Sequence, residues 1–302
     1  MNLLERLIGK IRNVSALPSQ TIDDIYRIDG LTNYDQHPVY SSHKAFPHFK
    51  AELERFKNVI LDAHTRGMAA SFFKFGDGDY YFLKGLPQGS AKPGNRALSK
   101  PLSDVDLKSF QNNSSGSDYY MCELYPENIA KFQEVFPQKR IDFPAEFSYI
   151  CTASNWFIRN FKNVGIIGAE EKINLIKMLS EKSEYQNSLG FDGFTSYISV
   201  PQKFACDDLD HQLDSLREQL SNSSADIFMV GIGHLKSGVL GELKKYKEAI
   251  YIDVGSGIDA LAGIIDTERP YFGDWTNFQL EDFDYSRMDY LRFNGKNIKI
   301  IK

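Results

Sequence analysis

Hydrophobic and polar positions follow two different spacings along the chain, one typical of helices and one typical of buried strands. Residues 48–66 place apolar side chains on one helical face, and Gly67 follows the last turn. The next apolar run, residues 71–75, is short and ends at a glycine-rich segment. The pattern therefore predicts a helix followed by a short strand.

From residue 162 onward, short apolar runs alternate with amphipathic segments. The predicted strands are residues 163–167, 194–200, 227–230 and 249–253. The predicted helices that follow them end near residues 182, 220, 246 and 264. Strands that alternate with helices form mostly parallel sheets with helices on both faces. The sequence therefore predicts an α/β fold, preceded by a mainly helical stretch at residues 103–160.

The first 47 residues differ from this body, and we assign them to an N-terminal helical arm ahead of a main domain at 48–302. Within the arm, residues 2–12 form an amphipathic helical pattern with a basic flank. Such a helix binds an anionic inner membrane surface, or it packs on the domain or on a second copy of the chain. Packing is the more common use, and both peripheral membrane contact and a homo-oligomer stay open.

Composition excludes several classes of protein. The chain has 302 residues and a net charge of −5, whereas a general nucleic-acid binder has a strongly basic footprint. Its three cysteines, Cys122, Cys151 and Cys206, are far apart, which argues against a disulfide framework and a structural zinc site. No apolar run approaches the length of a membrane span, and no signal peptide is visible. We therefore expect a cytoplasmic protein without nucleic-acid partners.

Candidate chemistry begins where the first predicted strand ends, at Gly76-Asp77-Gly78-Asp79. Glycines allow a sharp turn and close approach to a ligand, and two carboxylates offer hard oxygen ligands. Mg²⁺ and Mn²⁺ bound to a diphosphate favour such oxygens. The alternative is an Asp-Gly turn that only reverses the chain.

Two later strand ends carry a second candidate site. Gly231-Ile232-Gly233-His234 follows one strand, and Asp253 ends the next, as in a dinucleotide-binding fold. The third glycine of that motif is replaced by Lys236, which weakens the interpretation. An oxidoreductase or methyltransferase that uses the Gly231–Asp253 unit remains the alternative function. His234 either acts as a base or contacts phosphate, or it caps and packs the helix.

Cationic side chains lie in the loop at residues 86–101, which contains Lys92, Arg96 and Lys100. Three cations close to a pair of carboxylates would suit a diphosphate, although solvated loop charges are more common.

These segments together resemble a known enzyme family. Residues 73–79 are similar to the Arg-Phe-Gly-Asp-Gly-Glu segment of the bacterial glycosyltransferases with the GT-D fold. Residues 230–233 and 251–260 resemble the second half of that family, and the resemblance covers roughly residues 50–275. This chain has Asp79 where the family has Glu and Lys74 where it has Arg. The shorter Asp79 side chain puts direct metal ligation in question.

The resemblance implies a Rossmann-like fold, a nucleotide-sugar donor with a UDP-sugar as the first candidate, and Mn²⁺ or Mg²⁺. It implies transfer of a sugar to a glycan acceptor in bacterial surface polysaccharide or glycoprotein biosynthesis, in the cytoplasm or at the inner membrane face. The metal role carries over to Asp77 and Asp79, which with His234 are the expected catalytic residues. The expected donor-binding residues are Lys74, Gly76, Gly78, Arg96, Gly231, Gly233, Asp253 and Gly255.

Overall fold

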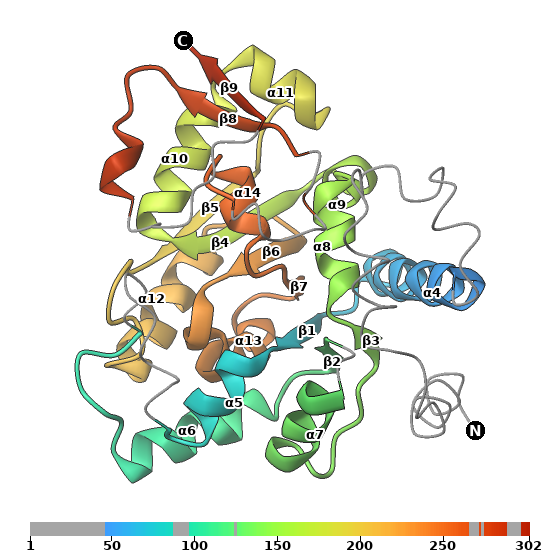
Figure 1. Ribbon diagram of the computed structural model, residues 1–302, viewed down its shortest axis with the longest axis vertical. Coiled ribbons are helices and arrows are strands. Elements are labelled where there is room, and N and C mark those ends of the chain that lie inside the picture. The colour runs from blue at the N-terminus through green and yellow to red at the C-terminus, as the bar shows by residue number, and fades with distance from the viewer. Residues whose placement is uncertain (1–45, 87–96, 124–125, 266–271, 273–274, 289–296) are drawn as a thin grey trace.

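The structure is a computed structural model, and it describes residues 46–86, 97–123, 126–265, 272, 275–288 and 297–302 (Figure 1). The amphipathic segment 2–12 lies outside the described residues, as do Lys92 and Arg96. The predictions made for these segments are therefore not addressed by the fold.

A seven-stranded sheet in the order β3-β2-β1-β7-β6-β4-β5 forms the centre of the molecule. All of its paired strands are parallel, which confirms the predicted α/β fold. Its strands are β1 (Ala70–Phe75), β2 (Tyr119–Cys122), β3 (Phe143–Pro144), β4 (Val164–Ala169), β5 (Ser196–Val200), β6 (Ile227–Gly231) and β7 (Ile250–Asp253). A second, two-stranded parallel sheet pairs β8 (Asn277–Leu280) with β9 (Ile298–Ile301).

Helices cover both faces of the large sheet (Figure 1). One face is covered by α4 (Phe46–Thr65), α8 (Glu146–Ala153), α9 (Trp156–Asn160), α10 (Glu170–Ser180), α11 (Ser183–Leu189) and α14 (Gly257–Leu261). The other is covered by α5 (Asp77–Leu83), α6 (Asp104–Ser114), α7 (Pro126–Val135), α12 (Leu209–Ser221) and α13 (Lys236–Tyr246). Short 3₁₀ turns lie at Gly233–Leu235 (η3) and Tyr285–Arg287 (η5).

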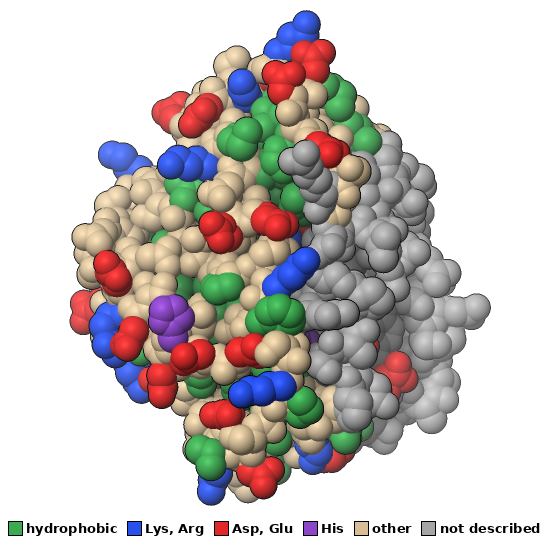
Figure 2. Space-filling view, turned by 90° about the vertical axis from the view of Figure 1, so that its left-hand side faces the viewer, with side chains coloured by type: hydrophobic (Ala, Val, Ile, Leu, Met, Phe, Trp, Pro, Cys, Tyr) green, Lys and Arg blue, Asp and Glu red, His purple; other side chains and the backbone are tan. Residues whose placement is uncertain are grey.

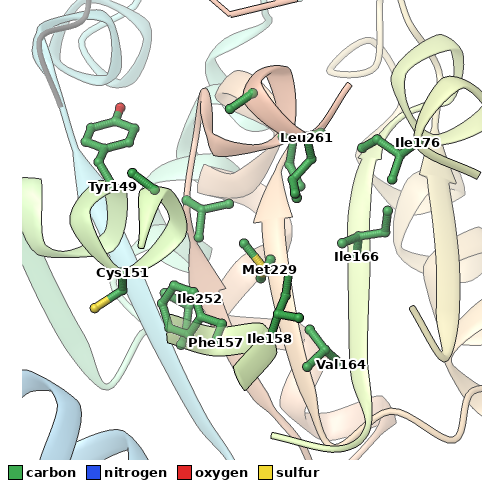
Figure 3. Close-up of a cluster of buried hydrophobic side chains, with 14 of the residues drawn as sticks. Tyr149, Cys151, Phe157, Ile158, Val164, Ile166, Ile176, Met229, Ile252 and Leu261 are labelled. Carbon is green, nitrogen blue, oxygen red and sulfur yellow. The ribbon is translucent and has the colours of Figure 1, made fainter. Parts of the chain in front are cut away.

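The core is divided by the sheet into two hydrophobic clusters. Along β1, Phe72 belongs to one cluster and Phe73 to the other, and along β7 Ile252 and Tyr251 divide in the same way. Figure 3 shows part of the first cluster, between the sheet and α8, α9 and α10. Because successive side chains of a strand point to opposite faces, strands buried on both faces are apolar throughout. This is why the short apolar runs in the sequence identify strands β4, β6 and β7.

Two parts of the sequence prediction were wrong. The stretch 103–160 is not purely helical, because β2 and β3 add two parallel strands to one edge of the sheet. The segment after β1 is not a simple turn either, since helix α5 begins at Asp77 with Gly76 as its N-cap. The Asp79 carboxylate accepts the N–H of Gly76 at 2.9 Å, so the acidic side chain helps to start the helix.

The three cysteines are all free and buried, as expected for a chain without a disulfide framework. Among the described residues, no helix combines the length and apolar character that crossing a membrane requires.

Candidate functional site

The candidate residues from the two halves of the chain meet where the order of the strands reverses. From β1 the chain runs outward through β2 to β3, and it then crosses to β4 on the other side, so that β7 lies beside β1. In open α/β sheets, ligands bind in the crevice at the carboxyl ends of the strands at such a reversal. Gly76 and Asp77 follow β1 there, and Asp253 ends β7.

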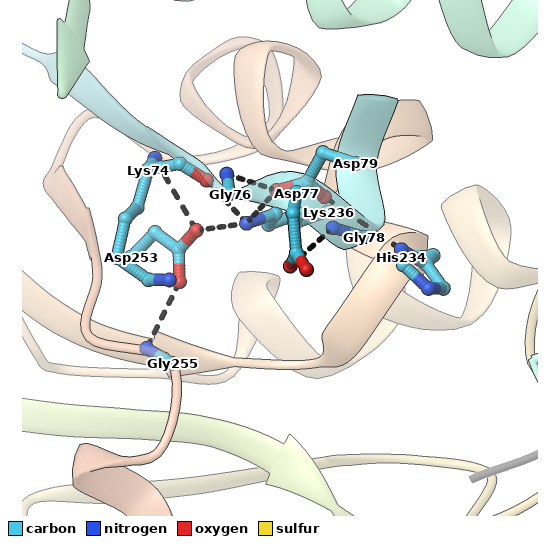
Figure 4. Close-up of polar contacts among 9 residues, drawn as sticks. All are labelled: Lys74, Gly76, Asp77, Gly78, Asp79, His234, Lys236, Asp253 and Gly255. Carbon is cyan, nitrogen blue, oxygen red and sulfur yellow. Dashed lines mark hydrogen bonds and ion pairs between the residues drawn. The ribbon is translucent and has the colours of Figure 1, made fainter. Parts of the chain in front are cut away.

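Lys236, the first residue of α13, occupies the centre of this region (Figure 4). Its ammonium lies 3.0 Å from Asp79 Oδ2 and 2.7 Å from Asp253 Oδ2. It also donates a hydrogen bond to the main-chain carbonyl of Lys74, so that its three N–H groups each have an acceptor. Only 5% of Lys236, 4% of Asp79 and 2% of Asp253 is exposed. Ion pairs this deeply buried require such complete pairing.

Asp253 has both carboxylate oxygens engaged within the protein. Its Oδ2 accepts the N–H of Lys74 at 3.3 Å in addition to the Lys236 ammonium. Its Oδ1 accepts the N–H of Gly255 at 2.9 Å. The carboxylate that the sequence suggested for a ribose therefore fixes the turn after β7 and the end of β1.

Asp79 lies between Lys236 and His234. Its Oδ1 is 3.7 Å from Nδ1 of His234, which is an ion-pair distance and too long for a hydrogen bond. Burial alone would raise the pKa of Asp79, but Lys236 and His234 outweigh burial and hold that pKa well below its ordinary value. Asp79 is therefore ionised at neutral pH.

His234, in η3, presents one edge of its ring to the site. The ring stacks on Phe82 of α5 with centroids 4.8 Å apart and planes 4° apart. Its Nδ1 is buried and has no hydrogen-bond partner, while 20% of the side chain is exposed. A Cβ added at Gly78 would lie 3.1 Å from His234 Cε1, so the glycine leaves room for the imidazole. The ring is thus held in place by packing and faces the Asp79 carboxylate.

Asp77 differs from the other carboxylates because it is exposed. Its Oδ1 accepts the N–H of Gly78 at 2.7 Å, and within the described part of the chain it has no ion pair. In Figure 4 its carboxylate points away from the ion-paired side chains. The structure therefore separates the two acidic side chains of the motif, with Asp77 open to ligands and Asp79 paired inside.

Metal ligation was predicted for Asp77 and Asp79 together. The described residues contain no cluster of three or more acidic, histidine or cysteine side chains suited to a metal ion. Since Asp79 is engaged by Lys236 and Gly76, Asp77 is the member of the pair whose oxygens are open to a cation. The metal itself stays a prediction.

Lys74 brings a second buried cation to the site. Burial would lower the pKa of its ammonium, but neighbouring groups, Tyr149 and Asp253 first, raise that pKa well above its ordinary value. The Lys74 Nζ lies 5.1 Å from the centre of the Tyr149 ring. Gly255, at φ +49°, borders its side chain.

The two glycines at the end of β6, Gly231 as its last residue and Gly233 just after it, have structural roles in this fold. A Cβ at Gly231 would come within 2.6 Å of the Gly255 carbonyl oxygen, so Gly231 permits close packing of two turns. Gly233 has a φ of 57°, in the left-handed region. Gly238, the glycine nearest to the missing third position of the dinucleotide motif, packs on Phe110. A donor-binding role for Gly231 and Gly233 stays a prediction.

Sequence reasoning missed Lys236 as the centre of the site. It also missed two glutamates beside Lys74, which are Glu123 and Glu146. Glu146, two residues after β3 and the first residue of α8, is buried, and its Oε2 has no hydrogen-bond partner. Burial and the nearby charge of Glu123 raise the pKa of Glu146 to about 8. Recognising β2 and β3 would have identified both glutamates, because each follows the end of one of these strands.

Surface charge gives no sign of a polyanion-binding face in the view of Figure 2. Acidic and basic side chains are interspersed there, and hydrophobic side chains form small separate groups. This distribution agrees with the net charge of −5.

Comparison with known proteins gave matches among solved structures alone. No protein-family model matches the chain, and no curated protein matches it. A structure described as a new glycosyltransferase from Streptococcus sanguinis is 14% identical, with a TM-score of 0.44, and the match covers 76% of this chain and 95% of that one.

Two further structures are of a similar kind. One is described as the highly conserved domain of unknown function 1792, with a distinct glycosyltransferase fold; it is 13% identical, with a TM-score of 0.46, over 83% of this chain and 88% of that one. The other is a selenomethionine-substituted domain of unknown function 1792; it is 15% identical, with a TM-score of 0.45, over 82% of this chain and 92% of that one.

Proposed function

We propose that the chain is a glycosyltransferase that takes a sugar from a nucleotide-sugar donor, with a UDP-sugar as the first candidate. The observation that supports this most directly is the position of the site. The exposed Asp77 and the partly exposed His234 lie over a buried Lys236 network where β1 and β7 end. A strand-order reversal of this kind is where doubly wound folds bind nucleotides.

The distribution of charge supports a diphosphate-containing ligand that binds together with a divalent cation. Lys74 and Lys236 balance the buried Asp79 and Asp253, so Asp77 is left as the uncompensated carboxylate of the motif. A divalent cation held by Asp77 and by phosphate oxygens of the donor would offset negative charge on the leaving nucleoside diphosphate. Backbone turns at Gly76 and Gly255 would bring main-chain groups close to the donor.

His234 is the proposed proton acceptor for the attacking hydroxyl of the glycan. A general base must reach the proton that it removes, and His234 has a partly exposed titratable ring that lies beside Gly78, the residue after Asp77. Asp79 would act as a positioning residue, because its charge stabilises the imidazolium that forms when the ring takes the proton. The acceptor would belong to bacterial surface polysaccharide or glycoprotein glycans.

The alternative, an oxidoreductase or methyltransferase built on the Gly231–Asp253 unit, is not favoured. Asp253 is 2% exposed and both of its oxygens accept hydrogen bonds from the protein. It is therefore not placed to bind the hydroxyl groups of a cofactor ribose.

Calorimetric titration with UDP, GDP, CDP, CMP, NAD and S-adenosylmethionine, each with Mn²⁺ and with EDTA, tests the proposal. We expect one nucleoside diphosphate to bind, more tightly with Mn²⁺ than with EDTA. Binding of NAD or S-adenosylmethionine without metal would replace the proposal with the alternative.

A further inference from the structure

Lys236 has the surroundings of a bound metal ion. Its ammonium contacts two carboxylate oxygens, one from Asp79 and one from Asp253, and the main-chain carbonyl of Lys74. Carboxylate and carbonyl oxygens are the ligands that hard divalent cations take in proteins. These three oxygens come from α5, from the end of β7 and from β1.

The charge balance supports the same view. The buried carboxylates of Asp79 and Asp253 face the buried ammonium groups of Lys74 and Lys236, and Glu123 adds a further negative charge near Lys74. A buried charge without a partner is strongly destabilising. The Asp79 and Asp253 carboxylates are therefore already in contact with a cation, whereas the exposed Asp77 has no ion pair in the described part of the chain.

We infer that Lys236 is the resident cation of the Asp79–Asp253 pair, and that Asp77 is the single carboxylate of the motif that receives a divalent ion. This inference rests on the proposed function. Asp79 is then a positioning residue for His234 and for the N-terminus of α5, and the protein binds the divalent ion together with the nucleotide. Without nucleotide, one exposed carboxylate is a weak ligand for Mn²⁺.

The removal of the ammonium tests this directly. In Lys236→Met two buried carboxylates and a carbonyl oxygen remain without their cation. We expect this variant to bind Mn²⁺ in the absence of nucleotide at least about tenfold more tightly than the wild type, a coupling of ordinary size. Electron paramagnetic resonance of free Mn²⁺ measures this without any enzymatic activity. A folded Lys236→Met protein without this gain overturns the inference.

Lys245→Met is the matched control. Lys245 lies on the same helix, its side chain is 62% exposed, and it pairs with Glu242 at 2.6 Å. Loss of this surface pair should leave Mn²⁺ binding unchanged. A gain in Lys245→Met as large as that in Lys236→Met also overturns the inference.

A second pair of variants decides the question if Lys236→Met does not fold. Asp79→Asn and Asp77→Asn each remove one charge with little change in shape. We expect Asp77→Asn to abolish the effect of Mn²⁺ on UDP affinity and Asp79→Asn to preserve it. Equal loss in the two variants, or nucleotide-free Mn²⁺ binding by the wild type that Asp79→Asn removes, overturns the inference.

These experiments distinguish a failure of the inference from a failure of the proposed function. If no nucleoside diphosphate binds under any condition, the glycosyltransferase proposal fails. The nucleotide-free Mn²⁺ titration of Lys236→Met still decides whether the ammonium occupies a cation site.

Discussion

Gly255 lies directly against the side chain of Lys74. A Cβ atom at Gly255 would sit 2.9 Å from Lys74 Cε and 3.1 Å from the hydroxyl of Tyr149. The backbone of Gly255 has a φ of 49°, a value that residues other than glycine rarely adopt. The buried ammonium of Lys74 can reach the site because this position has no side chain.

Gly255→Ala should therefore weaken both the fold and nucleotide binding. We expect a loss of about 1–2 kcal/mol in the free energy of unfolding from backbone strain alone, and weaker UDP binding because Lys74 is displaced. Urea denaturation and calorimetry measure the two effects. The matched control is Gly190→Ala, at φ +74° with nothing within 4 Å. It should lose similar stability and keep UDP affinity, and a loss of affinity in both variants would contradict the role given to Lys74.

His234→Gln should separate the chemistry from donor binding. The ring faces Asp79 and stacks on Phe82, and removal of a general base typically lowers rates by about 10²–10⁴-fold. We expect sugar transfer from the identified donor to fall by that amount, with nucleotide affinity unchanged. His211→Gln, on the exposed surface of α12, is the control. Transfer at the wild-type rate in His234→Gln would exclude His234 as the base.

Glu146 should make the stability of the protein depend on pH. Its pKa is about 8 in the folded state, against an ordinary value of 4.5, so the folded protein holds the proton over this range and the unfolded chain releases it. The contribution of Glu146 to the free energy of unfolding therefore falls by at most about 1.4 kcal/mol per pH unit as the pH rises from 4.5 to 8. Above pH 8 this contribution is level.

Glu146→Gln should remove this contribution to the slope. Urea denaturation between pH 5 and 9 measures the free energy of unfolding of both proteins. The difference between the variant and the wild type isolates the effect of this one residue. Glu218→Gln, at an exposed position of α12, is the control and should keep the wild-type slope. If Glu146→Gln keeps that slope as well, Glu146 is ionised in the folded protein.

Gly231→Ala tests whether this glycine serves packing or the donor. The added methyl group would meet Ile258 Cγ1 at 2.5 Å and the Gly255 carbonyl oxygen at 2.6 Å. Such overpacking typically costs about 1–3 kcal/mol, and we expect the melting temperature to fall. A stable variant that has lost nucleotide binding would instead favour direct contact of Gly231 with the donor.

The sequence predicted the central strands because each is a short run buried on both faces. It did not predict β2 and β3. The first is four residues long, and the second has two residues, one of them Pro144. A strand of two residues is too short to stand out, and the four-residue β2 is not followed by a glycine-rich segment like those after β1 and β7. Glu123 and Glu146 were missed because these two strands were missed.

The meeting of the candidate residues in space was predicted in part. Asp77, Asp79, His234 and Asp253 do meet at one edge of the sheet, because parallel strands share the same carboxyl edge. Their pairing was not predictable. Lys236 bonds to residues far away in the sequence, and spacing along the chain does not indicate which of several carboxylates an ammonium will reach.

The Lys236 ammonium also joins the two halves of the sheet. Lys74 and Asp79 belong to the half built from β1, β2 and β3, whereas Asp253 and Lys236 belong to the half built from β4 to β7. Separation of the halves would pull apart opposite charges in a medium with little water, which is costly. We therefore expect the N–H groups of Gly76 and Gly255, which both donate to these carboxylates, to exchange with solvent slowly and through global unfolding. The candidate ligand site would in this way also be the part of the molecule that makes its folding cooperative.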